Sequence, residues 1–266
     1  MSDALYVFIS QSGNSTDTVL AMEKVKSLGL KTLCITNNLQ SKMYLTADYK
    51  FDIEAGREQA IAATKTYSAS VVMLWLIACK IAQNKHLDIS EETKNIYSIK
   101  KNIENSIKDI DNVDLAAKFL SKLHDFSICG FGYNYALAKE SSLKIKETCY
   151  INTSSYPMGE FIHGHFALLN KSKVLLVFVT DGASEYELNL LKKIQSTYKP
   201  KIVVLSDVYE DYNCDILIKF NKGQSQIANI VNMIIAVQLL SFKIAKRLRR
   251  NIDKPIGLDK VVENKG

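Results

Sequence analysis

Residues 5–29 read LYVFISQSGNSTDTVLAMEKVKSLG, and this stretch decides the fold class of the first part of the chain. Residues 5–9 form an aromatic and β-branched run without polar alternation, which predicts a strand buried on both faces. Residues 14–28 show an amphipathic pattern that closes at Gly29 and predicts a helix. A strand, a short polar turn and a helix in this order are typical of a parallel α/β sheet.

The turn between this strand and this helix predicts an anion site. It is rich in polar side chains, namely Ser10, Gln11, Ser12 and Ser15 around Gly13. The helix N-terminus would place free backbone N–H groups and the positive end of the helix dipole at the same point. Ordinary capping is the alternative, but one cap needs only one hydroxyl. We therefore interpret the turn as a phosphate cradle.

Strands and helices alternate along the rest of the chain, and the pattern restarts once. Further strands are expected at residues 31–36, 47–53, 126–129, 174–179, 201–205 and 215–218. Long helices are expected from about residue 58 or 62, at 184–198 and at 225–250. Such alternation predicts parallel sheets with flanking helices in two α/β halves. The expected boundaries are 1–89 for the first domain, 90–123 for a helical connection, 124–250 for the second domain and 251–266 for a tail.

The stretch KESSLKIKETCYINTSSYPMGEFIHGH at residues 139–165 holds the densest pattern of ionisable groups. Glu140, Lys144 and Glu147 lie at helical spacing, so both carboxylates would lie near the ammonium group between them. The simpler interpretation is a solvated ion pair on a helix surface. Gly159 then introduces a turn that carries His163, so two carboxylates, an ammonium group and an imidazole could converge.

Composition narrows the class of protein. The chain has 266 residues, of which 47% are hydrophobic, enough for a sizeable core. No charged-then-apolar leader is visible, and the apolar stretch at residues 70–81 is broken by Lys80. We therefore expect a soluble cytoplasmic protein that does not cross a membrane. The net charge of +6 is mild, and the basic run at residues 243–250 lacks a nucleic-acid reader motif, so we expect no nucleic-acid partner.

The cysteines and histidines do not predict a metal site. Five cysteines are scattered without a C-x-x-C pair, which indicates reduced thiols, not disulfides or a zinc site. His163 and His165 form a His-x-His pair, but no acidic triad accompanies them. We expect no metal and no cofactor.

Five separated segments carry a family resemblance: ISQSGNSTDT, EQAIAATK, KESSLKIKETCYI, GEFIHG and DKPIGLDKVV. In order and spacing they resemble the proteins with two sugar isomerase (SIS) domains. This family includes the isomerase half of glucosamine-6-phosphate synthase and enzymes that deaminate or deglycate amino-sugar phosphates. The resemblance covers essentially the whole chain. It implies two flavodoxin-like subdomains and an isomerase-type enzyme that moves a proton between C1 and C2 of an amino-sugar or ketose 6-phosphate.

The resemblance also assigns residues. It implies that Ser10, Gln11, Ser12 and Ser15 bind the substrate phosphate, with further substrate contacts from Glu58, Ala63 and Thr64. Glu147 matches the carboxylate that moves the proton, and Lys144 and Glu140 match its neighbours.

The remaining implied site residues are His163 and Lys260. His163 matches an imidazole used in ring opening, which in the family reaches the site from the other subunit of a dimer. Lys260 matches a lysine of the tail that closes over the sugar.

Some features depart from the family pattern. No glutamine-hydrolysing domain is present, so synthase activity is not expected. Ile162 and His165 replace the lysine and proline usual beside His163 and Gly164. In the family the ISQSG strand follows another strand and a Gly-Thr-Ser turn, so the first subdomain is expected to be N-terminally truncated, or completed by another chain. Two interpretations remain open: a phosphosugar enzyme, or a non-catalytic sugar-phosphate-binding remnant or sensor.

Overall fold

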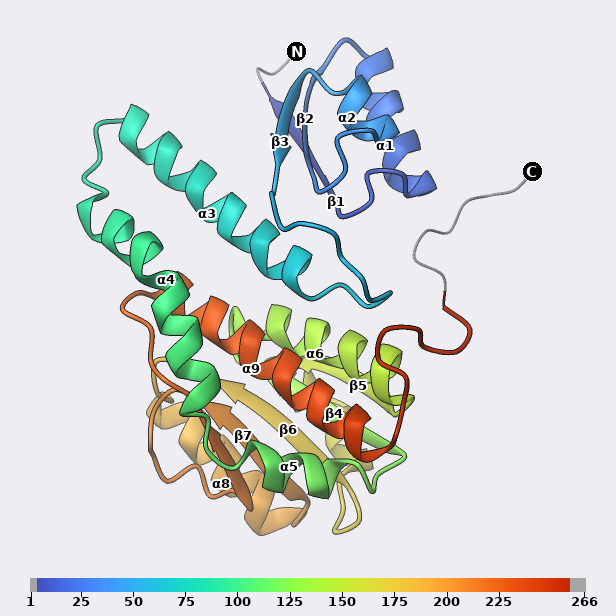
Figure 1. Ribbon diagram of the computed structural model, residues 1–266. Helices are drawn as coiled ribbons and strands as arrows, with labels where there is room; N and C mark the ends of the chain where they lie inside the picture. The colour runs from blue at the N-terminus through green and yellow to red at the C-terminus, as the bar shows by residue number, and fades with distance from the viewer. Residues whose placement is uncertain (1–3, 259–266) are drawn as a thin grey trace. The chain divides into compact units, whose positions relative to one another are not determined.

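The computed structural model describes residues 4–258 of the chain. The described residues form two compact units, each built around its own parallel sheet (Figure 1). The first unit comprises residues 4–85 together with 253–258, and the second unit comprises His86–Ile252.

The first unit contains a three-stranded parallel sheet in the order β1-β2-β3. Its elements are β1 (Leu5–Ser10), α1 (Thr16–Ser27), β2 (Lys31–Thr36), α2 (Lys42–Thr46), β3 (Tyr49–Asp52) and α3 (Lys65–Asn84). Side chains of α1 and α2 pack on Cys34 at one face, and side chains of α3 pack on Leu33 and Ile35 at the other. Alternate residues of β2 therefore supply two different cores, as the period of two in a strand requires.

β1 differs from the buried strand that the sequence predicts. It hydrogen bonds to β2 alone in the described chain, and Leu5, Tyr6, Val7 and Ile9 are between 38% and 48% exposed. The prediction of burial on both faces is therefore wrong for this structure. An apolar run shows that burial would be favourable, but burial also needs neighbours on both sides, and β1 has a strand on one side only.

Two helices of the first unit also depart from the predicted pattern. α3 begins at Lys65, later than predicted, because residues 53–64 form an irregular loop. The short helix α2 was not predicted. By length and apolar composition α3 and α9 (Gln226–Arg247) could each cross a membrane, a test that core helices of soluble proteins also pass. In α9, 61% of the apolar window is buried inside the protein, against 11% in α3.

The second unit contains five parallel strands in the order β5-β4-β6-β7-β8. Besides α9, its elements are α4 (Ser90–Lys108), α5 (Val113–Leu120), β4 (Asp125–Gly130), α6 (Asn134–Cys149), β5 (Asn152–Pro157), α7 (Met158–Phe161), η1 (His165–Leu168), β6 (Val174–Val179), α8 (Glu185–Thr197), β7 (Lys201–Ser206) and β8 (Ile216–Lys219). Along the chain this is the order 2-1-3-4-5, the flavodoxin-like arrangement that was predicted. The α/β fold class is confirmed.

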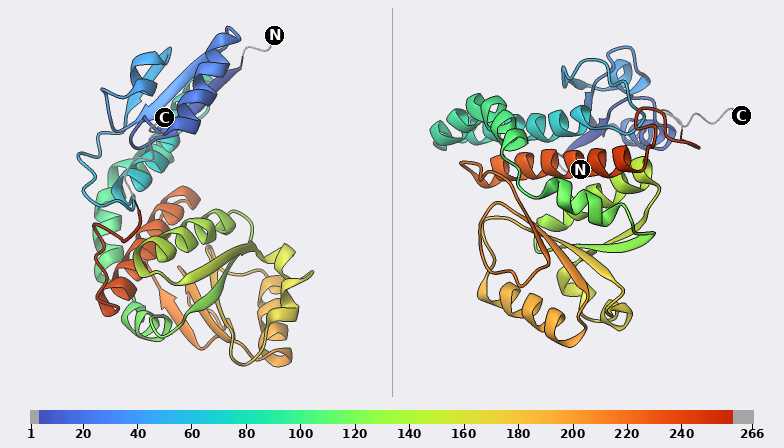
Figure 2. Two further views of the ribbon diagram at one scale, coloured as in Figure 1. Left: turned by 90° about the vertical axis from the view of Figure 1, so that its right-hand side faces the viewer. Right: turned by 60° about the horizontal axis from the view of Figure 1, so that its bottom comes forward.

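Helices cover both faces of this second sheet (Figure 2). α6 packs on β4, β5 and β6 and against α9, whereas α8 packs through Leu191 and Ile194 on the opposite face. The helical pattern of residues 90–123 corresponds to α4 and α5, which also pack on α9. β6 is buried along its whole length, so the core of the unit is centred on this strand.

The sequence prediction missed β5. This strand lies at the edge of the second sheet and reads NTSSYP, with few apolar residues. Hydrophobic periodicity identifies strands that are buried, and an edge strand with half-exposed side chains gives little such signal. β5 also contacts α6, because Ser142 Oγ of α6 donates a hydrogen bond to the carbonyl oxygen of Thr153 at 3.1 Å.

Candidate functional site

The polar turn between β1 and α1 presents hydroxyl groups beside a helix N-terminus. Ser10 Oγ accepts a hydrogen bond from Gly13 N at 3.0 Å, and Ser12 Oγ accepts one from Asn14 N at 3.2 Å. Ser15 is the N-cap of α1, yet its side chain makes no capping hydrogen bond. The accepting hydroxyls keep their own O–H donors, and the first N–H groups of α1 have no intrahelical partner. The turn can therefore donate several hydrogen bonds to an anion.

Gly13 fixes the shape of this turn. Its φ is +64°, a backbone conformation that glycine adopts without a steric penalty. A Cβ atom at this position would lie 2.1 Å from Ser41 Oγ and 2.9 Å from Thr36 Oγ1. Ser41 Oγ is itself engaged, because it caps α2 by accepting from Tyr44 N at 3.2 Å. The turn is thus held closely against β2 and α2, and no other residue fits at Gly13.

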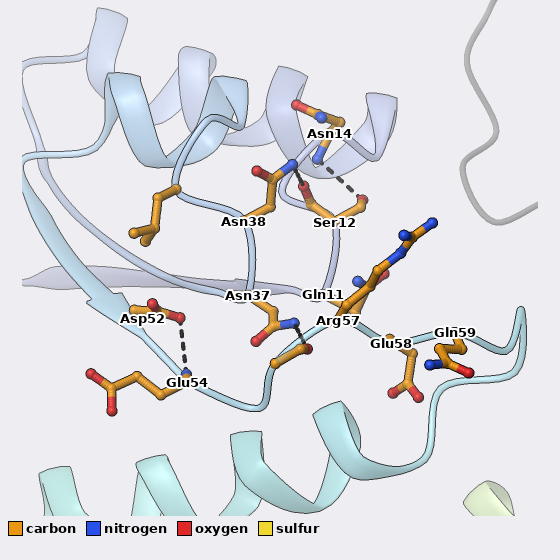
Figure 3. A pocket seen from close by; sticks show the side chains of 12 residues that line it. Gln11, Ser12, Asn14, Asn37, Asn38, Asp52, Glu54, Arg57, Glu58 and Gln59 are labelled. Carbon is orange, nitrogen blue, oxygen red and sulfur yellow. Dashed lines mark hydrogen bonds between the residues drawn. The ribbon is translucent and has the colours of Figure 1, made fainter.

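The turn lines a cavity of about 780 Å³ at the carboxyl ends of the three strands (Figure 3). Loops after β1, β2 and β3 all contribute lining residues. Asn38 Nδ2 donates to the carbonyl oxygen of Ser12 at 3.2 Å, and Asn37 Nδ2 donates to that of Gly56 at 2.7 Å. These two asparagines tie the three loops together. Ligands of open α/β sheets bind outside the carboxyl ends of the strands, which is where this cavity lies.

Glu58, Ala63 and Thr64 all lie in the loop that follows β3. Glu58 Oε2 accepts hydrogen bonds from Thr64 N at 3.2 Å, Thr66 N at 3.1 Å and Thr66 Oγ1 at 2.7 Å. Glu58 thereby satisfies N–H groups at the start of α3. It also lines the cavity. Ala63 is half-buried and Thr64 is the N-cap of α3.

The stripe of charged residues predicted at residues 140–147 lies on α6, in the second unit. Lys144 Nζ lies 2.5 Å from Glu147 Oε2 and 3.8 Å from Glu140 Oε1. The side chains of Lys144 and Glu140 are 4% and 9% exposed, whereas that of Glu147 is 22% exposed. The structure therefore brings these three residues together, and it buries the ammonium group. This arrangement differs from the solvated surface pair that was the alternative.

The two carboxylates of this cluster have different environments. Burial raises the pKa of Glu140 above its ordinary value, Lys144 opposes this rise, and Glu147 adds to it. Glu140 Oε1 is buried and has no hydrogen-bond partner among the described residues. Glu147, which is more exposed, accepts the short hydrogen bond from Lys144. A cation that holds one accessible carboxylate and approaches a second, buried one is an arrangement suited to proton transfer.

Of the two histidines after β5, His163 lies in the turn between α7 and η1, and His165 is the first residue of η1. His163 is exposed, and its backbone N–H donates to the carbonyl oxygen of Glu160 at 3.1 Å. His165 packs instead between aromatic rings, with its ring centroid 4.0 Å from that of Tyr156 and 5.6 Å from that of Phe161. Lys260 lies outside the residues that the structure describes.

The five cysteines are all free thiols in the described chain. Cys34, Cys129 and Cys149 are buried, and burial raises the pKa of Cys34 and of Cys149 to about 11. These buried thiols are protonated and inert at neutral pH. Cys79 and Cys214 are only partly buried.

The family model of the SIS domain matches residues 2–80 and 119–240, which together make up well over half of the chain. This chain belongs to the SIS domain family. The resemblance that the separated motifs indicated is confirmed.

Curated SIS relatives of the chain include two isomerizing glutamine–fructose-6-phosphate aminotransferases. The Campylobacter jejuni protein is 31% identical over 98% of this chain and 43% of its own length. The Pyrococcus horikoshii protein is 32% identical over 97% of this chain and 43% of its own length. The chain thus spans less than half the length of these relatives.

Solved structures of SIS proteins have the same fold. The C-terminal domain of glucosamine-fructose-6-phosphate aminotransferase from Francisella tularensis has a TM-score of 0.85 at 27% identity, covering 94% of this chain and 72% of that one. Glucosamine-6-phosphate deaminase from Thermotoga maritima has a TM-score of 0.76 at 23% identity, covering 98% and 76%. Because the Thermotoga maritima protein is only 23% identical to this chain, its likeness shows a shared fold and nothing more.

Sequence reasoning missed part of the SIS cavity in the first unit. Asn37 and Asn38 follow β2 directly, and Arg57 lies in the loop after β3. A signal was present, because polar residues directly after parallel strands gather at one edge of the sheet. It was overlooked because Asn-Asn is also an ordinary turn pair.

Proposed function

We propose that the chain binds a phosphorylated sugar and moves a proton between its C1 and C2 atoms, as an isomerase-type enzyme acting on an amino-sugar or ketose 6-phosphate. The observation that carries the proposal is the buried Lys144, hydrogen bonded to the accessible Glu147 and close to the buried Glu140. The relatives named above act on fructose 6-phosphate or glucosamine 6-phosphate, which makes these two sugars the first probes.

The first unit supplies phosphate recognition in this proposal. Ser10, Gln11, Ser12 and Ser15 provide hydroxyl, amide and N–H donors around the N-terminus of α1. Such donors favour a dianion over a neutral sugar. Recognition of this kind binds substrate and transition state alike, so it anchors the sugar and leaves the chemistry to other groups.

The second unit supplies the proton transfer. Glu147 acts as the base that takes the carbon-bound proton at one carbon and returns it at the neighbouring one. Lys144 stabilises the negative charge that develops on the sugar oxygen in the enediol or enolamine. Glu140 stays next to Lys144 as the buried second carboxyl group. His163 assists ring opening, Lys260 closes over the sugar, and no metal or cofactor takes part.

We further propose that the chain acts as a homodimer in which His163 serves the site of the neighbouring subunit. The exposed position of His163, in a turn instead of a core, supports this proposal. An imidazole at a surface turn is free to reach another subunit, whereas the packed His165 is not.

The experiment that tests the chemistry is exchange of a carbon-bound hydrogen with solvent deuterium, followed by NMR at C1 of fructose 6-phosphate and at C2 of glucosamine 6-phosphate. Glu147→Gln keeps the shape of the side chain and removes the base, so binding should persist while exchange falls by roughly 10²–10⁴-fold. Glu185→Gln, at an exposed position on α8, is the matched control.

Two outcomes would count against this mechanism. Exchange that Glu147→Gln leaves unchanged would remove Glu147 from the chemistry. Binding of sugar phosphate by the wild-type protein without any exchange would instead support the alternative of a non-catalytic sugar-phosphate-binding protein.

A further inference from the structure

The cavity in the first unit carries an unusual balance of charge for a phosphate site. Its described ionisable lining residues are the acids Asp52, Glu54 and Glu58 and the base Arg57. The serine turn contributes donors but no full positive charge. A phosphate dianion placed among three carboxylates would be repelled, unless a cation balances the charge nearby.

Arg57 is available for that task. Among the hydrogen bonds and ion pairs of residues 4–258, none engages its guanidinium group, and the residue is exposed. The nearby Lys65 is already committed, because its Nζ donates to the carbonyl oxygen of Arg57 at 2.6 Å. Glu58 is also committed, through its three hydrogen bonds to Thr64 and Thr66. Glu58, the neighbour of Arg57 in sequence, therefore already has hydrogen-bond partners other than Arg57.

Hydrogen bonds hold the loop that carries Arg57, although none of residues 4–258 pairs with the side chain of this arginine. Gly56, with φ +66°, receives a hydrogen bond on its carbonyl oxygen from Asn37 Nδ2, and Arg57 receives the one from Lys65. The backbone on both sides of the arginine is thus tied to the sheet and to α3. In Figure 3 the Arg57 side chain extends from this loop toward the side of the cavity where Ser12 and Asn14 lie.

We propose that Arg57 is a specificity-determining residue, whose guanidinium group binds the phosphate group of the ligand held by the turn at residues 10–15. The inference rests on the proposed sugar-phosphate binding and adds to it the source of charge selectivity. Guanidinium groups pair with phosphate oxygens through two parallel hydrogen bonds, which an ammonium group cannot reproduce. The cavity therefore selects a doubly charged phosphate over a neutral sugar and over the singly charged form of the phosphate.

Isothermal titration of the whole chain with fructose 6-phosphate, inorganic phosphate and fructose tests the proposal. Arg57→Gln should weaken binding of both phosphates by roughly 10- to 100-fold, the loss expected for hydrogen bonds to a charged group. Arg57→Lys should recover part of the affinity. Lys31→Gln is the matched control, because it removes the same charge from an exposed position at the amino end of β2, the opposite edge of the same sheet.

The pH dependence gives a readout that a merely structural role would not change. The second ionisation of a phosphate ester has a pKa of about 6. Wild-type affinity for fructose 6-phosphate should therefore rise between pH 5 and pH 7.5, and this rise should be smaller in Arg57→Gln.

The outcomes separate this inference from the proposed chemistry. If Arg57→Gln binds both phosphates as the wild type does, the role of Arg57 is overturned while sugar-phosphate binding stands. If the wild type binds neither phosphate, the binding site and the role of Arg57 fall together. If Arg57→Gln weakens binding but the wild type exchanges neither the C1 hydrogen of fructose 6-phosphate nor the C2 hydrogen of glucosamine 6-phosphate, the inference holds and the proton transfer fails.

Discussion

Glu140 is a carboxyl group at a position where a negative charge is costly. Burial raises its pKa above the ordinary 4.5. Between pH 4.5 and this raised pKa, the folded protein therefore binds a proton at Glu140 that the unfolded chain has lost. A raised folded-state pKa contributes stability that is complete below the unfolded pKa and is lost as the pH rises through the folded pKa. Glutamine does not ionise, so Glu140→Gln removes this loss of stability at high pH. We expect the unfolding free energy of the variant, minus that of the wild type, to increase as the pH rises above 4.5.

Urea unfolding at pH 4, 5, 6, 7 and 8 measures this difference directly. Glu185→Gln, an exposed change on α8, should give a difference that does not rise in this way. A difference for Glu140→Gln that falls with pH would show that attraction to Lys144 outweighs burial, and that Glu140 is charged in the folded protein.

For Glu140, Lys144 and Glu147, the sequence predicted the spacing of the side chains correctly, but it could not predict that Lys144 is buried. Helical periodicity alone places Glu140, Lys144 and Glu147 on one stripe, and α6 confirms this. The same periodicity is found on any solvated helix. Lys144 is buried because α6 packs on β4, β5 and α9, and those contacts lie far from it in sequence. Availability of the Arg57 side chain likewise depends on which neighbours are already paired.

At the scale of elements, Asp48 fastens the start of β3 to the start of β2. Its Oδ2 accepts hydrogen bonds from Thr32 N at 2.9 Å and Thr32 Oγ1 at 2.8 Å, and Lys26 of α1 lies 3.3 Å from its Oδ1. These bonds, first of all those from Thr32, lower the pKa of Asp48 from 3.8 to about 2. A lowered folded-state pKa stabilises the protein above the unfolded pKa, and this stability is lost as the pH falls through the folded pKa.

Asp48→Asn should therefore lower the unfolding free energy at pH 6 and remove the part of the acid sensitivity that lies between pH 3.8 and about 2. Urea unfolding of the whole chain at pH 6, 4, 3 and 2, monitored by circular dichroism, measures the unfolding free energy of both proteins. Asp17→Asn, on the exposed side of α1, is the control. An Asp48→Asn protein with the same acid sensitivity as the wild type would contradict the role of this carboxylate.

Elements with strong patterns were predictable, and elements at edges were not. β2, α1, α8 and the sheet-forming alternation follow from apolar periodicity and end signals, and the structure confirms them. β5 escaped because an edge strand is polar. The five consecutive apolar residues of β1 predict burial on both faces, but such a run shows only that burial would be favourable, not that it occurs. Whether a strand is covered depends on what lies beside it.

At the scale of the whole molecule, the proposed mechanism makes one subunit depend on another. Glu147 would act in its own subunit, whereas His163 would act in the site of its partner. Sedimentation velocity at micromolar concentration should then show a dimer. A folded, active monomer would contradict the proposal, because it would complete its site without a second chain.

Mixing two inactive variants gives a sharper test of the same proposal. In a dimer of Glu147→Gln with His163→Asn, one site receives both substitutions and the other site receives neither. Equal co-expression makes half of the dimers mixed, so about a quarter of the wild-type hydrogen exchange should return if His163 acts across the dimer. If His163 acts within its own chain, every site in the mixture carries one substitution and exchange stays at the level of the separate variants. Exchange that is already normal in His163→Asn alone would instead remove this imidazole from the reaction.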